Sequence, residues 1–146
     1  MVASGLPAVK AINWRGFCLQ TGGTFDSKGN GCGVTVSEVL ESLFLAWKNG
    51  DALRAGAHFA LDARYQEARH EPIVGREAIV AHFTAFFRDG PAWRFHVDDV
   101  LTGADRAAVR YRFEIAEADG GWRTRAGCAF ATLHDGTLTE WREYEG

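Results

Sequence analysis

Hydrophobic side chains recur with a helical period directly after residue 34, and they predict the first ordered element of the chain. Thr35-Val36-Ser37-Glu38 has the form of a capping box, in which a hydroxyl and a carboxylate bond backbone N–H groups at the start of a helix. Gly50 ends this helix, and Asp51 can begin a short second helix that runs to about residue 58. The apolar stripe of the first helix consists of Val36, Val39, Leu40, Leu43, Phe44 and Trp47.

The pattern then changes to a strand period over residues 59–68. Pro72 and Gly75 mark a loop after it, and a third helix is predicted over residues 76–88, ended by Gly90-Pro91. The inward side of this third helix carries Ile79, Phe83, Phe86 and Phe87. One face of the predicted strand carries Leu61, Ala63, Tyr65 and Glu67.

The remaining residues alternate through four strands that are joined by short turns containing glycine. Such turns favour antiparallel hairpins. The order of elements therefore predicts an α+β fold, in which three helices wrap a curved antiparallel sheet around one pocket. The four strands are expected over residues 93–101, 106–118, 122–134 and 137–144. The third of them is rich in small residues, which permit close approach of a bound ligand or a second subunit.

Residues 1–33 differ from the domain predicted over residues 34–146. They are rich in Gly, Ser, Thr and Asn and show no sustained periodicity. Two interpretations stay open. The segment is an N-terminal extension, which can dock as a strand or as an arm over a partner subunit, or it is an over-extended gene start before Val34 or Val36.

Composition and charge exclude several classes of function. The 146 residues are 47% hydrophobic and 24% charged, as is usual for a globular protein, and the formal net charge is −3. The basic residues are scattered, so we expect no binding to nucleic acid. No apolar run approaches the roughly 20 residues that cross a bilayer. The N-terminus lacks the pattern of a signal peptide, and we expect a cytoplasmic protein that does not bind membranes.

The sequence predicts neither a metal site nor a cofactor. Cys18, Cys32 and Cys128 are far apart and form no C-x-x-C pair, so a disulfide framework and a zinc site are not indicated. The five histidines lack the spacing of metal ligands, and no glycine-rich phosphate loop precedes a helix.

Short motifs across residues 34–146 resemble the nuclear-transport-factor-2-like superfamily, in its SnoaL-like and limonene-epoxide-hydrolase-like branch. The resemblance implies a cone-like α+β roll of the cystatin-like type, with a pocket for a small apolar organic ligand. It also implies a homodimer formed through the outer face of the sheet. The matching motifs are Phe59-Ala60-Leu61-Asp62-Ala63, Gly75-Arg76-Glu77-Ala78-Ile79, Asp135-Gly136-Thr137-Leu138 and Trp141-Arg142-Glu143-Tyr144.

The same resemblance implies a set of catalytic residues. Tyr65-Gln66-Glu67 stands where limonene epoxide hydrolase has its Tyr and Asn, and Glu143 replaces the Asp of its closing strand. Arg112-Phe113-Glu114 stands in for its Arg-x-Asp, or Arg110 takes the arginine position if the strand register shifts by two residues. The catalytic set implied is Tyr65, Glu67, Arg112, Glu114 and Glu143.

A comparison with ketosteroid isomerases places their catalytic carboxylate at Glu67. Their oxyanion-hole tyrosine falls on Leu43, so we do not expect steroid isomerisation. A carboxylate such as Glu67 in an apolar cone has its pKa raised by desolvation and can serve as a general base or acid near neutral pH.

Two faces remain open to alternative interpretations. Arg112 and Glu114 alternate with apolar residues, so their side of the strand either faces solvent or lines a polar pocket. Glu143 shares a face with Trp141, which suits a cavity wall or a sheet exterior that a dimer partner covers. The expected ligand-binding wall consists of Leu43, Trp47, Phe83, Phe87, His96 and Trp141.

Three functions follow from these patterns. The first is a cofactor-independent hydrolase, isomerase or cyclase that uses carboxylates for acid–base catalysis. The second is a non-catalytic domain that binds a small hydrophobic ligand, and the third is a dimerisation module. The enzyme hypothesis requires Glu67 to share a cavity with Glu114 or Glu143.

Overall fold

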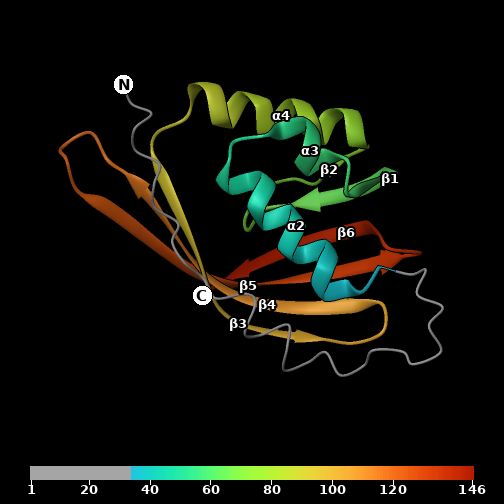
Figure 1. Ribbon diagram of the computed structural model, residues 1–146. Helices are drawn as coiled ribbons and strands as arrows, with labels where there is room; N and C mark the ends of the chain where they lie inside the picture. The colour runs from blue at the N-terminus through green and yellow to red at the C-terminus, as the bar shows by residue number, and fades with distance from the viewer. Residues whose placement is uncertain (1–33) are drawn as a thin grey trace.

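The computed structural model describes residues 34–146, which are the predicted domain (Figure 1). Residues 1–33 lie outside the described residues, and so do the two interpretations of that segment and the cysteines Cys18 and Cys32. Within residues 34–146, no helix is long and apolar enough to cross a membrane.

The helices begin where the sequence places their capping residues. Both bonds of the capping box form, because the Glu38 N–H donates to the Thr35 hydroxyl at 3.1 Å and the Thr35 N–H donates to the Glu38 carboxylate at 3.0 Å. Asp51 caps the short helix by accepting the N–H of Arg54 at 3.0 Å. The described helices are α2 (Val36–Lys48), α3 (Ala52–Gly56) and α4 (Arg76–Asp89).

The strands form a single mixed sheet in the order β2-β1-β6-β5-β4-β3. The last four strands pair antiparallel in sequence order, which confirms the predicted meander. β1 runs parallel to β6, so the sheet is not wholly antiparallel. The strands are β1 (Phe59–Gln66), β2 (Ile73–Val74), β3 (Trp93–Thr102), β4 (Arg106–Ala116), β5 (Trp122–His134) and β6 (Thr137–Glu145).

Two local features of β1 depart from the sequence prediction. The segment between Pro72 and Gly75 is not only a loop, because it contains β2, which pairs antiparallel with β1. The register of β1 against β6 shifts between Phe59 and Arg64. Leu61 lies in this irregular stretch and is 76% exposed, so it does not share the buried face of Ala63 and Tyr65 as predicted.

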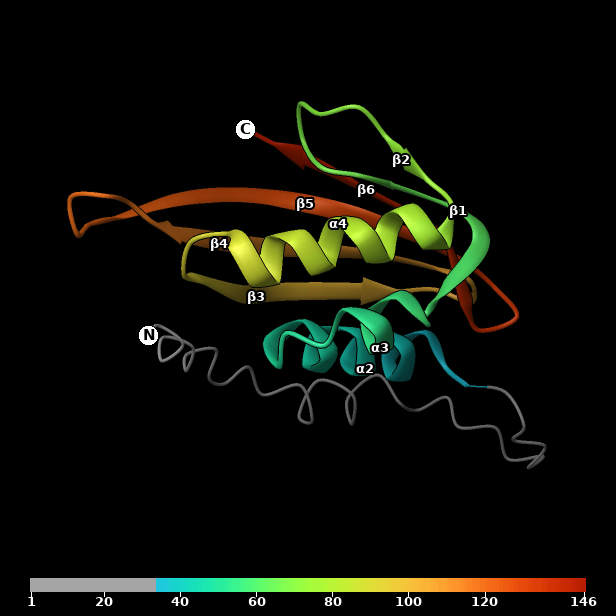
Figure 2. The ribbon, with the colours of Figure 1, turned by 90° about the horizontal axis from the view of Figure 1, so that it is seen from above.

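The three helices gather on one side of the curved sheet (Figures 1 and 2). No described helix covers the opposite side. This arrangement confirms the predicted cone-like α+β roll. The concave side of the sheet and α4 therefore face each other across the interior, and the site described below lies between them.

Candidate functional site

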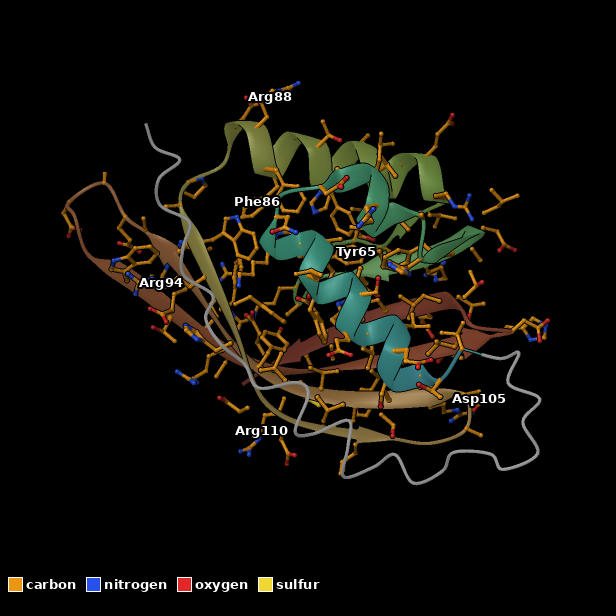
Figure 3. The ribbon with its side chains drawn as sticks, viewed as in Figure 1. Tyr65, Phe86, Arg88, Arg94, Asp105 and Arg110 are labelled. Carbon is orange, nitrogen blue, oxygen red and sulfur yellow. The ribbon has the colours of Figure 1, made fainter. Side chains whose placement is uncertain are left out.

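A cavity of about 170 Å³ opens between α4, the end of β1 and the concave side of the β3–β6 meander. Its wall combines aromatic rings with a few ionisable groups. Figure 3 shows Phe86 pointing from α4 toward the sheet, whereas Arg88, two residues later, points away from it. The aromatic wall includes Phe83, Phe86, Phe87, Trp93, Phe95 and Phe113.

The rings of this wall pack against one another and hold each other in place. Phe87 and Trp93 stack with ring centroids 6.0 Å apart, and Trp93 lies 5.9 Å from Phe113. Phe95 stacks on Tyr111 at 5.5 Å. Aromatic pairs at these separations are favourable beyond the area they bury. The wall is therefore preformed and apolar, which suits an organic ligand.

The first ionisable group in the cavity is the carboxylate of Glu67, which directly follows β1. Its Oε2 lies 2.8 Å from Nε2 of His82 and accepts the Tyr65 hydroxyl at 3.3 Å. Burial raises the pKa of Glu67, but the hydrogen bond and charge of His82, the charge of His70 and the Tyr65 hydrogen bond together outweigh burial. The pKa therefore falls below its ordinary value, whereas burial was expected from the sequence to raise it. The same hydrogen bond raises the pKa of His82. Both shifts favour the charged forms, so the contact is an ion pair whenever His82 is protonated.

The second ionisable group is the carboxyl of Glu143 on β6. Its Oε1 accepts the indole N–H of Trp141 at 3.0 Å, and its Oε2 accepts the hydroxyl of Tyr111 at 3.3 Å. Burial and the negative charge of Glu67 raise the pKa of Glu143 to about 7, although the two hydrogen bonds oppose this change. Glu143 is therefore poised to hold or release a proton at neutral pH.

Both tyrosines of the cavity remain neutral donors. Burial and the nearby carboxylates raise the pKa values of Tyr65 and Tyr111 well above the ordinary value. The cavity thus joins an ionised carboxylate, a carboxyl that titrates near neutrality and two neutral phenols. One carboxylate that accepts protons beside one carboxyl that donates them is an arrangement typical of acid–base catalysis.

The structure brings part of the predicted site together. The predicted site residues that line the cavity are Trp47, Tyr65, Glu67, Phe83, Phe87 and Glu143. Leu43 and Trp141, both 0% exposed, lie in the core instead of on the cavity wall. Trp141 still affects the site, because its indole N–H binds the Glu143 carboxyl.

Arg112, Glu114 and His96 do not line the cavity. Arg112 binds Asp98, with Nη2 to Oδ1 at 2.8 Å. Glu114 lies 2.6 Å from Nε2 of His96. The reason is the alternation of side chains along β4, which turns Tyr111 and Phe113 into the cavity and their neighbours to the outer face.

The alternative register does not bring an arginine of β4 to the cavity either. Arg110 lies 3.8 Å from Asp99 and is also absent from the cavity wall. Figure 3 shows Arg110 and Arg94 outside the sheet, away from α4. The Arg-x-acid pair of the epoxide hydrolase comparison is therefore not assembled at this cavity. The polar side of β4 does not line this cavity: the Arg112 side chain is 47% exposed, whereas Glu114 is held between Arg94 and His96 on the outer face of the sheet.

Four ionisable residues of the cavity wall were not predicted as site residues: His82, Tyr111, Arg125 and Glu145. The helical period contains a signal for His82, which lies three residues after the inward Ile79. For Tyr111, the signal is its place on the apolar side of its strand. Arg125 and Glu145 come from neighbouring strands and approach to 3.9 Å, which no local pattern indicates.

Residues 40–141 match the model of a protein family that is described as the SnoaL-like domain. Among proteins with curated descriptions, no sequence matches the chain.

Solved structures with the same fold include three that carry information on ligands or activity. A candidate polyketide cyclase of Pseudomonas putida aligns with a TM-score of 0.65 and 20% identity, over 78% of this chain and 93% of that one. A Catenulispora acidiphila protein with a ketosteroid-isomerase-like fold, in complex with trimethylamine, aligns at 0.66 and 15%, over 76% and 86%. TerC, co-crystallised with polyporic acid, aligns at 0.66 and 15%, over 75% and 89%. At these identities the likeness shows the fold.

Proposed function

The chain belongs to the SnoaL-like domain family, and we propose that its cavity is the active site of a cofactor-independent enzyme that moves protons on a small carbonyl compound. The family and the fold support a domain that binds small molecules. The step from binding to catalysis depends on one observation. Glu67 and Glu143 line the same aromatic cavity, and their pKa values are shifted in opposite directions.

Glu67 is the general base of the proposed reaction. Both of its hydrogen bonds to Tyr65 and His82 end on Oε2. This leaves Oε1 to take a proton from the carbon next to the substrate carbonyl. The ion pair with His82 keeps the carboxylate ionised and in a fixed orientation, as general base catalysis requires.

Glu143 is the general acid. In its protonated form it donates to the carbonyl oxygen while Glu67 removes the carbon-bound proton, and an enol results. Where a carbon–carbon double bond is conjugated with this enol, the intermediate is a dienol. The cycle then closes when Glu67 returns its proton to the far carbon of the dienol and Glu143 recovers the enol proton, which is an isomerisation. If the enol carbon instead attacks a second carbonyl group of the same molecule, Glu143 recovers the enol proton and Glu67 gives its proton to the new alkoxide oxygen. The product is then a hydroxylated ring, as in a cyclase.

The size and lining of the cavity limit the substrate. An apolar cavity of about 150 Å³ binds benzene. The volume of about 170 Å³ therefore suits a ligand portion of one or two rings. Epoxide hydrolysis has less support than proton transfer at carbon, because the arginine that the epoxide hydrolase comparison requires lies outside the cavity.

Proton exchange tests the proposal without knowledge of the product. A panel of one- and two-ring ketones, such as cyclohexanone and indanone, is incubated with the protein in D2O, and loss of the α-proton signals is followed by NMR. Glu67→Gln should slow the exchange by about 10²–10⁴-fold, the usual contribution of a general base. Glu71→Gln, at an exposed position outside the cavity, is the matched control.

Binding measured in the same samples separates the remaining hypotheses. If ketones bind but no member of the panel exchanges, the non-catalytic ligand-binding hypothesis replaces the enzyme hypothesis. If exchange occurs and Glu67→Gln leaves it unchanged, Glu67 is not the base.

The outer side of the sheet supports a second proposal, a homodimer. Phe130 is 51% exposed and Tyr144 is 47% exposed, and their rings lie 5.7 Å apart on adjacent strands. The guanidinium of Arg142 lies 5.2 Å from the Tyr144 ring centroid. Exposed aromatic and arginine side chains are enriched in protein interfaces. We therefore place the dimer contact on this patch of Phe130, Arg142 and Tyr144.

A further inference from the structure

The phenol of Tyr111 reaches Glu143 by crossing an entire strand. Tyr111 lies on β4 and Glu143 on β6, and β5 runs between them. The β5 residue directly opposite Tyr111 is Gly127, which pairs on its other side with Glu145. Residues directly opposite one another in a sheet share a face, so a side chain at position 127 would stand in the path of the phenol.

The space above Gly127 is already filled by its neighbours. A Cβ atom at this position would lie 2.8 Å from the Tyr111 hydroxyl and 3.1 Å from Cγ of Glu145, and it would also meet the carbonyl oxygen of Tyr144. Gly127 does not have the positive φ that elsewhere in this chain favours glycine. The position therefore requires a glycine for space and not for backbone conformation.

We propose that Gly127 is a positioning residue for the acid Glu143, because it leaves open the inner side of β5 across which the Tyr111 phenol reaches that carboxyl. The inference rests on the proposed function, because only that proposal makes Glu143 the general acid. The inference also gives a physical reason for one of the small residues of β5. At Gly127 the side chain that approaches closely is Tyr111 of the same domain, and not a bound ligand or a second subunit.

The hydrogen bond from Tyr111 lowers the pKa of Glu143 against the effect of burial. Loss of this bond should therefore raise that pKa. The experiment measures the Glu143 carboxyl by 13C NMR over a pH series in the wild type, Gly127→Ala, Tyr111→Phe and the double variant. Gly103→Ala adds the same methyl group at a turn where it meets only ordinary contacts, and it serves as the control.

We expect Gly127→Ala and Tyr111→Phe each to raise the Glu143 pKa, the double variant to show no further shift, and Gly103→Ala to show none. A wild-type pKa in folded Gly127→Ala, or a shift that adds to that of Tyr111→Phe, would overturn the proposal. No substrate is needed, so this outcome is independent of whether proton exchange at carbon is detected.

Gly127→Ala can also destabilise the sheet, because the methyl group meets backbone as well as the phenol. The thermal midpoints of the same four proteins decide that case. The methyl group should lower the midpoint less in the Tyr111→Phe background than in the wild type, since the nearest side-chain atom is then gone. If the methyl group lowers the thermal midpoint equally in both backgrounds, glycine is required at this position only because the β6 backbone approaches closely. That result would contradict the proposal.

Discussion

Nε2 of His82 lies 2.8 Å from Oε2 of Glu67, and this contact joins the middle of α4 to the residue that follows β1. The contact sets the protonation of both groups. Without it, burial would raise the pKa of Glu67 against only the charge of His70 and the Tyr65 hydrogen bond, and it would lower the pKa of His82 against only the charge of Glu143. Both groups would then shift toward the neutral form. The ion pair therefore keeps a base ionised inside an aromatic cavity.

His82→Ala should reverse the pKa shift of Glu67. The variant removes the hydrogen bond and charge of His82, which lower the pKa of Glu67 most. The pKa of Glu67 therefore rises, and the base is protonated over more of the acidic range. Proton exchange should fall more steeply below neutral pH than above it. The pH profile of exchange measures this, with His134→Ala, whose side chain is 80% exposed, as the control. An equal loss at every pH would assign His82 a role in shape and not in protonation.

Glu143→Gln should change how stability depends on pH. The folded pKa of Glu143, about 7, lies above the ordinary value of 4.5, so the folded state keeps its proton to higher pH than the unfolded state does. Stability from this group is therefore present at acidic pH and is lost as the pH rises from 4.5 through about 7. The loss is at most about 3–4 kcal/mol, at 1.36 kcal/mol per pH unit.

Urea unfolding at about pH 5 and about pH 8 measures this difference. The wild type should lose more stability between the two conditions than Glu143→Gln, which cannot ionise. Glu140→Gln removes a carboxylate from the same strand but outside the cavity, and it should behave as the wild type. Identical losses in the wild type and Glu143→Gln would show that Glu143 is already ionised at acidic pH.

Arg112→Ala should leave ligand affinity unchanged, although Arg112 was predicted as a site residue. Its guanidinium binds Asp98 outside the cavity, and an exposed pair of this kind contributes about 0–1 kcal/mol to stability. Phe113→Leu, one position further along β4, should weaken the binding of a two-ring ketone by about 0.5–1.5 kcal/mol, the usual gain from an aromatic contact. Titration calorimetry compares the two variants. If Arg112→Ala binds the ketone more weakly than the wild type does, Arg112 contributes to the ligand site and this prediction is wrong.

The contrast between Arg112 and Phe113 shows where sequence reasoning succeeds and fails. The capping box at Thr35 and the turns of the meander are local, so residues close in sequence determine them. The alternation along β4 correctly separated a polar side from an apolar side. The resemblance to an epoxide hydrolase favoured the polar side for the site, whereas the cavity uses the apolar one.

Other features depend on contacts between distant segments. β1 pairs in parallel with β6, a strand far away in the sequence. No local turn motif therefore predicts this pairing. The site contact between His82 and Glu67 also spans two elements. Tyr111 reaches Glu143 only because Gly127 is small, which requires three strands to be placed before the relation is visible. Tertiary packing determines these contacts, and they cannot be predicted from the hydrophobic period of a single segment.

Phe130→Asp should dissociate the proposed homodimer. The substitution replaces the exposed ring of Phe130 by a strongly hydrated carboxylate in the patch of Phe130, Arg142 and Tyr144. Desolvation of that carboxylate in an interface is unfavourable even beside Arg142, its cross-strand neighbour. Phe130 is 51% exposed in the single chain, so the change should cost the monomer little stability. Sedimentation velocity across a range of concentrations should show a dimer for the wild type and a monomer for the variant. Leu53→Asp, on α3 and 74% exposed, is the control and should remain dimeric. A wild type that sediments as a monomer at all concentrations, or a Phe130→Asp variant that stays dimeric, would remove this side of the sheet as the contact.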